Sequence, residues 1–494
     1  NTLTITSGSG AVDIASTVGG TTAVSSLKIN ESSGTGTIAV NNIGDGDPVA
    51  GVTGLTVLGN ANTSSLTTDG TNYDFGGGIT IGPDFTMVGS PLNNSFTTSG
   101  NVSFGGDVTV DGTLTVNTSG GNISIAGNIT STGKDEVVSL SDGTGTGTIT
   151  LGGTVTSGDI TLIGDSGISI AGDITSNKDG AAGAIALTGP VTLTGNVIVT
   201  ADDHADSTIT FNSTSTVNAS SSGGQSLTLD TDAGAIAMQG AIGGSTALNA
   251  LTVNNDGAGT IEITNIGTSS AAGVTGLTRL GTQSTGSLTM DGTNYNFGGG
   301  FTIGPNYTMT SHPSSFTTVG DVNFLGTVQV DGTFSINSGG GDITIAGNIT
   351  STGEDEIISL TDGTAGDGSG TITLGGTVSA SNITLVGDSG IVLSGDITSN
   401  NTGSAGAIAF TGPITLADTS SDSVTIDADQ HADTTVTFNA TATVNAATSG
   451  GQSLTIDTDA GAIAMQGAIG GSTALSALTI NADGAGTIDI GNQP

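Results

Sequence analysis

Short clusters of aspartate are the residues of this chain best suited to bind a ligand. Asp230 and Asp232 begin a D-x-D-x-G pattern that ends at Gly234, and Asp457 and Asp459 repeat it. Carboxylates and loop carbonyls are the hard oxygen ligands that Ca²⁺ takes in proteins. The pattern lacks the third carboxylate and the distal glutamate of a complete calcium loop. Two interpretations therefore stay open, a calcium site or an Asx turn that ends a strand.

A second kind of acidic cluster contains histidine, in the segments ADDHAD and ADQHAD. Its members are Asp202, His204 and Asp206 in the first segment and Asp429, His431 and Asp433 in the second. Histidine and carboxylate groups at this spacing suit a divalent cation. The alternative is a polar, exposed loop. The third histidine, His312, has no counterpart and is interpreted as a loop residue. Calcium is the only cofactor that the sequence suggests.

Cationic side chains are too few to indicate a lyase. A lyase usually needs a cation that stabilises a developing carbanion or acts as a base. The chain offers only Lys28, Lys134, Lys178 and Arg279. Where the sequence repeats itself, Glu, Asn and Val stand at the positions that match the last three. None of them therefore marks a repeated site.

Adjacent carboxylates are the remaining catalytic candidates. Glycoside hydrolysis uses two carboxyl groups about 5–9.5 Å apart. The densest acidic pair is Asp135 and Glu136, with its copy Asp355 and Glu356. Neighbouring residues on a strand point to opposite faces, so we interpret both pairs as solvated loops. We assign no catalytic residue and predict that the chain is not an enzyme.

Aromatic residues gather in one motif that occurs twice, as DGTNYDFGGG and DGTNYNFGGG. The motif contains Tyr73 and Phe75 in the first copy and Tyr295 and Phe297 in the second. Rings of this kind stack on sugars when they are exposed. The alternative, which we favour, is that they fill a wider part of a narrow core.

Composition excludes several classes of partner. The chain has 494 residues, of which 85 are Gly and none is Cys or Trp, and 43 Asp and Glu face only 4 Lys and Arg, for a net charge of −39. Such a surface repels nucleic acid and anionic membranes. Without cysteine, neither disulfides nor thiolate metal sites hold the fold together. No apolar run approaches the ~18 residues of a membrane span.

Self-comparison reveals a long repeat of about 225 residues. Residues 225–263 and 452–490 differ at five of 39 positions, and residues 2–40 are a more diverged copy. The repeat units are 2–225, 226–452 and a partial unit, 453–494. We expect the chain to be a piece of a longer array or a processed product.

A shorter pattern lies inside each repeat. Residues 101–118 read as three steps of six, NVSFGG, DVTVDG and TLTVNT, each an apolar-polar-apolar triplet followed by turn formers. The pattern predicts one inward-facing set (Val102, Phe104, Val108, Val110, Leu114 and Val116) and one outward-facing set (Ser103, Thr109 and Thr115). No segment has a helical period. Steps of six are too short for a β-sandwich, whose strands recur every 8–12 residues or so.

These patterns predict an all-β fold, a right-handed parallel β-helix in which each triplet forms one wall and each Gly, Asn or Asp pair one corner. We expect one continuous solenoid over residues 1–494. With roughly 20 residues per turn it would have roughly 25 turns and, at ~4.8 Å per strand spacing, a length of order 120 Å.

Phrases such as NVSFGGDVTVDGTLTVNT and GGDITIAGNIT resemble the parallel β-solenoid repeats of giant bacterial surface proteins, the filamentous-haemagglutinin-like and autotransporter-passenger-like group. The resemblance covers nearly the whole chain. It implies secretion, adhesion or filament building, and brings no catalytic residues. The amino-terminal secretion domain of such exoproteins is not found in the sequence.

The sequence therefore predicts a structural extracellular protein of the cell surface, a filament, tether or adhesive stalk, that associates with itself end to end or laterally. Two alternatives stay open. One is a segment of an adhesin that binds surface glycans or another partner, and the other is a carbohydrate-active β-helix enzyme, a lyase or hydrolase.

Overall fold

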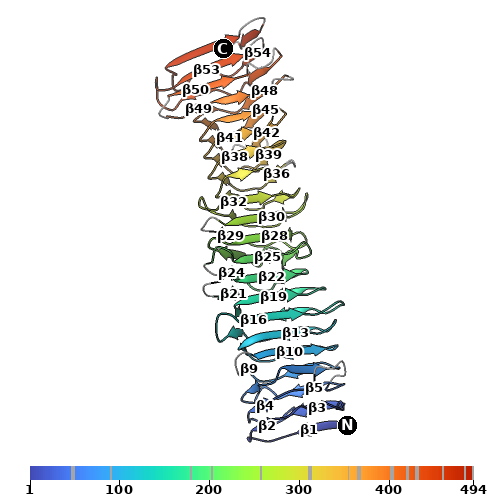
Figure 1. Ribbon diagram of the computed structural model, residues 1–494. Coiled ribbons are helices and arrows are strands. Elements are labelled where there is room, and N and C mark those ends of the chain that lie inside the picture. Colours follow the sequence, from blue (N-terminus) through green and yellow to red (C-terminus); the bar gives the residue numbers. More distant parts are fainter. Residues whose placement is uncertain are drawn as a thin grey trace. The chain divides into compact units, whose positions relative to one another are not determined.

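The computed structural model describes residues 1–45, 51–88, 92–178, 181–201, 204–255, 259–309, 314–353, 355–363, 369–400, 405–418, 422–428, 433–458, 461–482 and 486–491. Within these ranges the chain is all-β and contains no helix. It divides into two compact units, residues 1–248 and residues 249–494. In each unit parallel strands stack into a β-solenoid (Figure 1), and together the units contain about 18 turns.

The first unit is built from three ladders of parallel strands, called walls 1, 2 and 3. Wall 1 contains β1 (Thr2–Ile5), β3 (Ser26–Ile29), β5 (Thr56–Leu58), β8 (Ile79–Ile81), β11 (Val102–Phe104), β14 (Ile123–Ile125), β17 (Ile149–Leu151), β20 (Ile168–Ile170), β23 (Val191–Leu193) and β26 (Val217–Ala219). Wall 2 contains β2 (Val12–Ile14), β4 (Ile38–Val40), β6 (Leu66–Thr68), β9 (Phe85–Met87), β12 (Val108–Val110), β15 (Ile129–Ser131), β18 (Val155–Ser157), β21 (Ile174–Ser176), β24 (Val197–Ala201) and β27 (Leu227–Thr231). Wall 3 contains β7 (Asn72–Phe75), β10 (Leu92–Thr98), β13 (Gly112–Asn117), β16 (Val137–Ser141), β19 (Asp159–Ile163), β22 (Ala184–Thr188), β25 (Thr208–Phe211) and β28 (Ala235–Ile242).

The second unit also contains three ladders of parallel strands, and we number them by the strands of the first unit to which they correspond in sequence. Wall 1 contains β29 (Leu251–Asn255), β31 (Thr278–Leu280), β34 (Phe301–Ile303), β37 (Val322–Phe324), β40 (Ile343–Ile345), β43 (Ile372–Leu374), β46 (Ile391–Leu393), β49 (Ile414–Leu416) and β52 (Val444–Ala446). Wall 2 contains β30 (Thr260–Ile266), β32 (Ser287–Met290), β35 (Tyr307–Thr308), β38 (Val328–Val330), β41 (Ile349–Ser351), β44 (Val378–Ala380), β47 (Ile397–Ser399), β50 (Ser423–Asp427), β53 (Ser453–Thr458) and β55 (Ala477–Ala482). Wall 3 contains β33 (Tyr295–Asn296), β36 (Ser314–Thr317), β39 (Thr333–Asn337), β42 (Ile357–Thr361), β45 (Asn382–Val386), β48 (Ala407–Thr411), β51 (Thr435–Phe438), β54 (Ala462–Met465) and β56 (Thr487–Ile490).

The apolar-polar-apolar triplets form the walls, as the sequence predicts. The three triplets of residues 101–118 lie in β11, β12 and β13, one on each wall. Their apolar side chains are 0–1% exposed, whereas the serine and threonine between them are half-buried on the outside. In-register pairing places each apolar residue on its equivalent, for example Val108 on Ile129 and Ile129 on Val155. Burial of each such side chain contributes about 1.5–3 kcal/mol.

Side chains at the corners add hydrogen bonds between turns. Asp84 Oδ1 accepts the backbone N–H of Asp107 at 2.9 Å, and Asp107 Oδ1 accepts that of Asn128 at 2.7 Å. Asn128 Oδ1 continues the row by accepting the N–H of Thr154 at 2.9 Å. A side-chain oxygen at this corner therefore accepts a hydrogen bond from a backbone N–H group that has no partner in the strand ladder.

The predicted turn length of about 20 residues and the predicted 25 turns are wrong, because the chain makes about 18 turns. Paired positions on neighbouring turns are 19 residues apart at Ser157 and Ser176, but 30 apart at Val197 and Leu227. The difference lies in the corners. Gly158 alone joins β18 to β19, whereas residues 132–136 join β15 to β16. The right-handed coil and its continuity over residues 1–494 stay predictions.

Candidate functional site

The D-x-D-x-G aspartates lie at the end of a wall 2 strand. Asp230 is the outward-facing residue before the end of β27, where it pairs with Thr200, and Asp232 is exposed just beyond it. In the second copy Asp457 faces outward on β53, between Asp427 and Asn481 on the adjacent strands. Asp459 lies outside the described residues. Calcium at these positions stays a prediction.

The histidine-containing clusters are described only in part. His204 is half-buried and its Nδ1 accepts the backbone N–H of Asp206 at 3.1 Å, with an Asp206 carboxylate oxygen 3.9 Å away. Asp433 is exposed in the second copy. The other members, Asp202, Asp429 and His431, lie outside the described residues, as does His312. Across the described ranges, no three His, Asp or Glu side chains form a group that could hold a metal ion.

Lys28 and Lys178 are held in ion pairs. Lys28 Nζ lies 2.8 Å from Glu31 Oε1, and Lys178 Nζ lies 2.7 Å from Asp159 Oδ2. Arg279 points outward from β31, between Thr252 and Thr302 on the neighbouring strands. Lys28 lies on β3 and Arg279 on β31, whereas Lys178 follows β21.

The aromatic motif lies in the core. Tyr73, Phe75, Tyr295 and Phe297 are 1–2% exposed, so their rings are not available to stack on a sugar. Tyr73 stacks on Phe96 of the next turn at a centroid distance of 5.0 Å, and Tyr295 on Phe316 at 5.7 Å. The interpretation of these residues as core fillers is confirmed.

Burial changes the acidity of both tyrosines. Tyr73 Oη accepts the N–H of Gly70 at 2.9 Å, and Tyr295 Oη accepts that of Gly292 at 2.7 Å. Desolvation by burial raises the pKa of Tyr73 to about 12, and it raises the pKa of Tyr295 further. Both hydroxyls therefore stay protonated at neutral pH.

A fully buried carboxylate, Asp142, follows β16. Its Oδ1 accepts the N–H of Asp165 on the next turn at 3.1 Å. Desolvation raises the pKa of Asp142, hydrogen bonds from the backbone oppose this rise, and the nearby charge of Asp165 adds to it. Asp142 thus joins two turns in the manner of the corner aspartates.

The interpretation of the Asp135–Glu136 and Asp355–Glu356 pairs as solvated loops is wrong for the glutamates. Asp135 and Asp355 are exposed, but Glu136 is half-buried and Glu356 is only 5% exposed. Sequence reasoning missed them because each stands beside an exposed aspartate. Their Oε2 atoms are buried without a hydrogen-bond partner, together with the Oδ1 atoms of Asn177 and Asn400.

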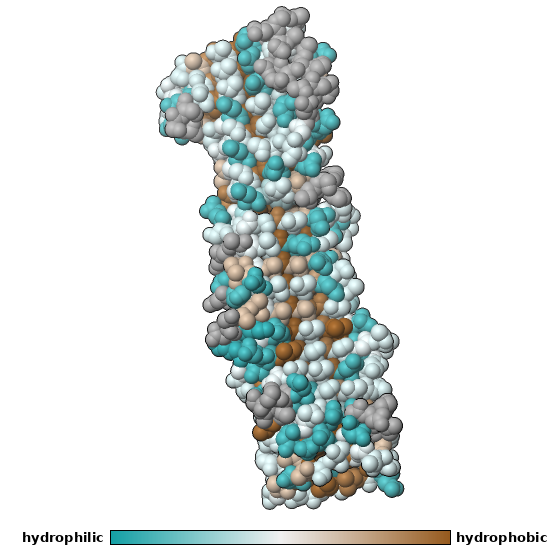
Figure 2. All heavy atoms as spheres, viewed as in Figure 1, coloured by the Kyte–Doolittle hydropathy of each residue, from teal (hydrophilic) through white to brown (hydrophobic). Residues whose placement is uncertain are grey.

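The outer walls are rich in hydroxyl groups. On the face shown in Figure 2 the described surface of each unit is mostly pale or teal, and brown residues are scattered. One row of outward-facing residues on wall 1 of the second unit runs through Thr302, Asn323, Thr344 and Thr373 on successive strands. Such rows present short polar side chains at the strand spacing of ~4.8 Å.

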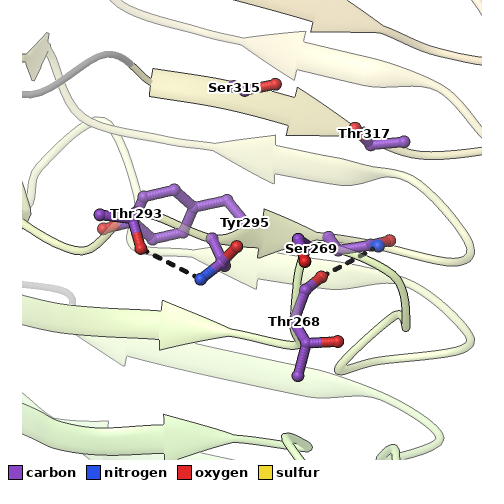
Figure 3. Close-up of a pocket in the computed structure, with 8 residues that line it drawn as sticks. Thr268, Ser269, Thr293, Tyr295, Ser315 and Thr317 are labelled. Atoms are coloured by element: carbon purple, nitrogen blue, oxygen red, sulfur yellow. Dashed lines mark hydrogen bonds between the residues drawn. The ribbon is translucent and has the colours of Figure 1, made fainter.

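Several hollows interrupt these walls in the second unit, and two of them bear on ligand binding. The first has a volume of about 220 Å³ and is lined by Thr268, Ser269, Thr293, Asn294, Tyr295, Asn296, Ser315 and Thr317 (Figure 3). In it Asn294 Nδ2 donates to Thr293 Oγ1 at 3.0 Å and Asn296 Nδ2 to the carbonyl of Thr268 at 3.3 Å. The second has a volume of about 520 Å³ and is lined by Arg279, Gly281, Thr282, Gln283, Ser284, Thr302 and Leu325. Both offer hydrogen-bonding groups.

A comparison of the chain with protein-family models, with curated proteins and with solved structures found no match. The structure is that of a parallel β-helix repeat protein, and it bears out this part of the resemblance to bacterial surface proteins. None of the described residues belongs to a helix long and apolar enough to cross a membrane.

Proposed function

We propose that this chain is a non-enzymatic structural segment of an extracellular protein, a stalk, tether or filament whose work is mechanical. The observation that carries the proposal is that the two units repeat one architecture, three ladders of parallel strands around a narrow apolar core. Phe104 lies on Ile125 in wall 1 of the first unit as Phe324 lies on Ile345 in the second. The cationic residues, by contrast, are not repeated between the copies, as where Lys134 corresponds to Glu354.

Repetition of this kind suits a load-bearing role. Every turn is joined to its neighbours by three strand ladders and by corner side chains, so stability grows with the number of turns. Duplication lengthens such an array without a new core or a new surface. Secretion and self-association, end to end or side by side, are part of the proposal, as in the bacterial surface proteins that the sequence resembles.

Immunogold electron microscopy of the producing cells tests the proposal. Antibodies against residues 1–494 should label fibres or stalks outside intact cells, and pre-immune serum should not. Electron diffraction from aligned fibres should show an axial repeat of ~4.8 Å. Label that appears only after the cells are permeabilised would contradict an extracellular role, and label without fibres would contradict a filament.

A glycan-binding adhesin is the second candidate, and the hollow around Arg279 favours it. A guanidinium with neighbouring amide and hydroxyl groups suits the carboxylate of an acidic sugar. Among the described residues Arg279 makes no ion pair. If the hollow binds such sugars, oligogalacturonate should bind the parent chain in titration calorimetry, and Arg279→Gln should weaken binding about tenfold or more.

Lys28→Gln is the matched control for that measurement, because it removes one positive charge from the other unit. Equal loss in the two variants would indicate a general effect of charge. No binding to the parent chain would remove this candidate.

A further inference from the structure

A partly buried polar cluster at the corner between walls 2 and 3 of the first unit recurs at the corresponding corner of the second. In the first unit it contains Ser131, Gly133, Glu136 and Asn177, and in the second unit Ser351, Gly353, Glu356 and Asn400. We call each of these sets a corner cage. The glutamate ends the loop 132–136 in the first unit, and in the second unit it lies directly before β42. The asparagine of each cage comes from two turns further along the solenoid.

The glutamate of each cage folds back over the glycine of its own loop. A Cβ atom added at Gly353 would lie 2.7 Å from Glu356 Oε1, and one added at Gly133 would lie 2.5 Å from Glu136 Oε1. Only a residue without a side chain leaves this space for the carboxylate. Glu356 is 5% exposed, and the Oε2 atoms of both glutamates are buried without a hydrogen-bond partner.

The asparagine of each cage lies two turns further along the solenoid and forms hydrogen bonds with the serine and the glycine of the same cage. Asn400 Nδ2 donates to Ser351 Oγ at 2.6 Å and to the carbonyl of Gly353 at 3.0 Å. In the first unit Asn177 Nδ2 donates to Ser131 Oγ at 3.2 Å and to the carbonyl of Gly133 at 3.3 Å.

The turn that lies between the loop and the asparagine has a short corner, so it does not block the contact between them. Its corner is a single residue, Gly158 in the first unit and Ser381 in the second. The Nδ2 atom of the asparagine donates both of these hydrogen bonds, and neither of them involves Oδ1. The Oδ1 atoms of Asn177 and Asn400 are buried without a hydrogen-bond partner.

Each cage therefore holds two buried oxygen acceptors, one from a carboxylate and one from an amide, and neither has a donor. Thr352 Oγ1 donates to Glu356 Oε1 at 3.4 Å, so only the Oε2 atom of that carboxylate lacks a donor. A buried carboxylate oxygen without a partner is unfavourable unless a cation or a hydrogen-bond donor compensates it. The arrangement is present in both copies, although the residue next to Gly133 changes from Lys134 to Glu354. Its donor atoms are all oxygens, which hard cations prefer.

We propose that each corner cage binds one calcium ion, through the glutamate Oε2 and the asparagine Oδ1, with water completing the coordination. The ion would connect a corner loop to the turn two steps away and stiffen the solenoid there. This proposal concerns residues other than the D-x-D-x-G aspartates. It does not depend on the proposed mechanical function, because it is tested on the isolated chain.

Calorimetric titration of the metal-free chain with CaCl₂ in ~0.15 M NaCl, which screens diffuse attraction to the acidic surface, tests the proposal. The parent chain should bind two ions with similar affinity. Glu136→Gln and Glu356→Gln should each remove one site, and the double variant should remove both. Asp135→Asn with Asp355→Asn is the matched control, since it removes the same charge from the adjacent exposed residues.

Thermal unfolding gives a second, independent measurement. Calcium should raise the unfolding temperature of the parent and of the aspartate control, but not that of the glutamate double variant. In EGTA the double variant should be at least as stable as the parent, because a neutral amide costs less to bury than a carboxylate. Asn177→Ala with Asn400→Ala removes the other ligand without a change of charge and should also abolish calcium binding.

Two results would overturn the proposal. The first is a parent chain that binds no calcium at millimolar concentration, which would mean that water or a proton satisfies the cages. The second is equal calcium binding by the glutamate variants and the aspartate control, which would place the ions elsewhere on the acidic surface.

Discussion

Tyr73 and Tyr295 place their hydroxyl groups in the apolar core. As a result, the free energy of unfolding should change with pH in the alkaline range. Below pH 10 the phenol is protonated in both the folded and the unfolded chain. Above pH 10 it ionises in the unfolded chain, while the pKa of Tyr73 in the folded chain is raised to about 12. The stability that comes from the neutral buried phenols is therefore present below pH 10 and is lost as the pH rises towards 12.

The double variant Tyr73→Phe with Tyr295→Phe should lose less stability than the parent between pH 9 and pH 11, measured by urea unfolding. At pH 9 it should be less stable by about 1–3 kcal/mol for each site, because the N–H groups of Gly70 and Gly292 lose their acceptor. All other ionisable groups are common to the two chains, so their contributions cancel in the comparison. An equal loss in the two chains would assign the alkaline transition to those groups instead.

The corner cages show which residue-scale features the sequence could not predict. Glu136 follows an exposed aspartate in a polar loop, and nothing within that loop indicates that it is buried. Its environment is set by Asn177, whose amide reaches residues 44 and 46 positions earlier. Sequence comparison between copies holds one usable signal. Ser131, Gly133, Glu136 and Asn177 all recur in the second unit, while Lys134 between them does not.

At the scale of the strands and corners, close stacking of the turns demands glycine at particular positions. Gly189 lies between β22 and β23 with φ +103°, and a Cβ atom there would lie 1.9 Å from the carbonyl oxygen of Gly164. Gly332 has nearly the same φ, +104°, but nothing lies within 4 Å of its Cβ position. A comparison of alanine substitutions at the two positions therefore distinguishes the cost of backbone strain from the cost of a steric clash between turns.

Gly332→Ala should lower the free energy of unfolding by about 1–3 kcal/mol, the cost of a strained backbone. Gly189→Ala should cost about 1–3 kcal/mol more, because its methyl group also forces two turns apart. Urea unfolding followed by circular dichroism measures both. Similar losses in the two variants would mean that the turns separate easily at this corner.

The wall strands could be predicted from the sequence, because each triplet alternates on its own and needs no distant partner. The inward set of residues 101–118 is buried as the alternation indicates. The number of turns could not be predicted from the sequence, because it depends on corner lengths that differ from one turn to the next. Both the one-residue corner at Gly158 and the five-residue corner at residues 132–136 contain turn-forming residues. The six-residue pattern therefore does not distinguish a short corner from a long one.

For the whole molecule, the dominant electrostatic term is self-repulsion. A net charge of −39 is carried by turns that stack at the strand spacing of ~4.8 Å. Asp427 and Asp457 show the local form of this repulsion, because they face outward at paired positions of β50 and β53. The unfolded chain separates such charges more widely, so repulsion favours unfolding.

Screening should therefore stabilise the chain. The Debye length falls from ~30 Å at 0.01 M to ~8 Å at 0.15 M ionic strength, which shortens the range of repulsion to a turn or two. In EGTA, differential scanning calorimetry should show the unfolding temperature rising over this range, equally with NaCl, KCl and choline chloride, since screening does not depend on the cation. Calcium at constant ionic strength should add a separate increase, absent from Glu136→Gln with Glu356→Gln. An unfolding temperature that stays constant or falls with added salt would mean that repulsion is equally strong in the unfolded chain.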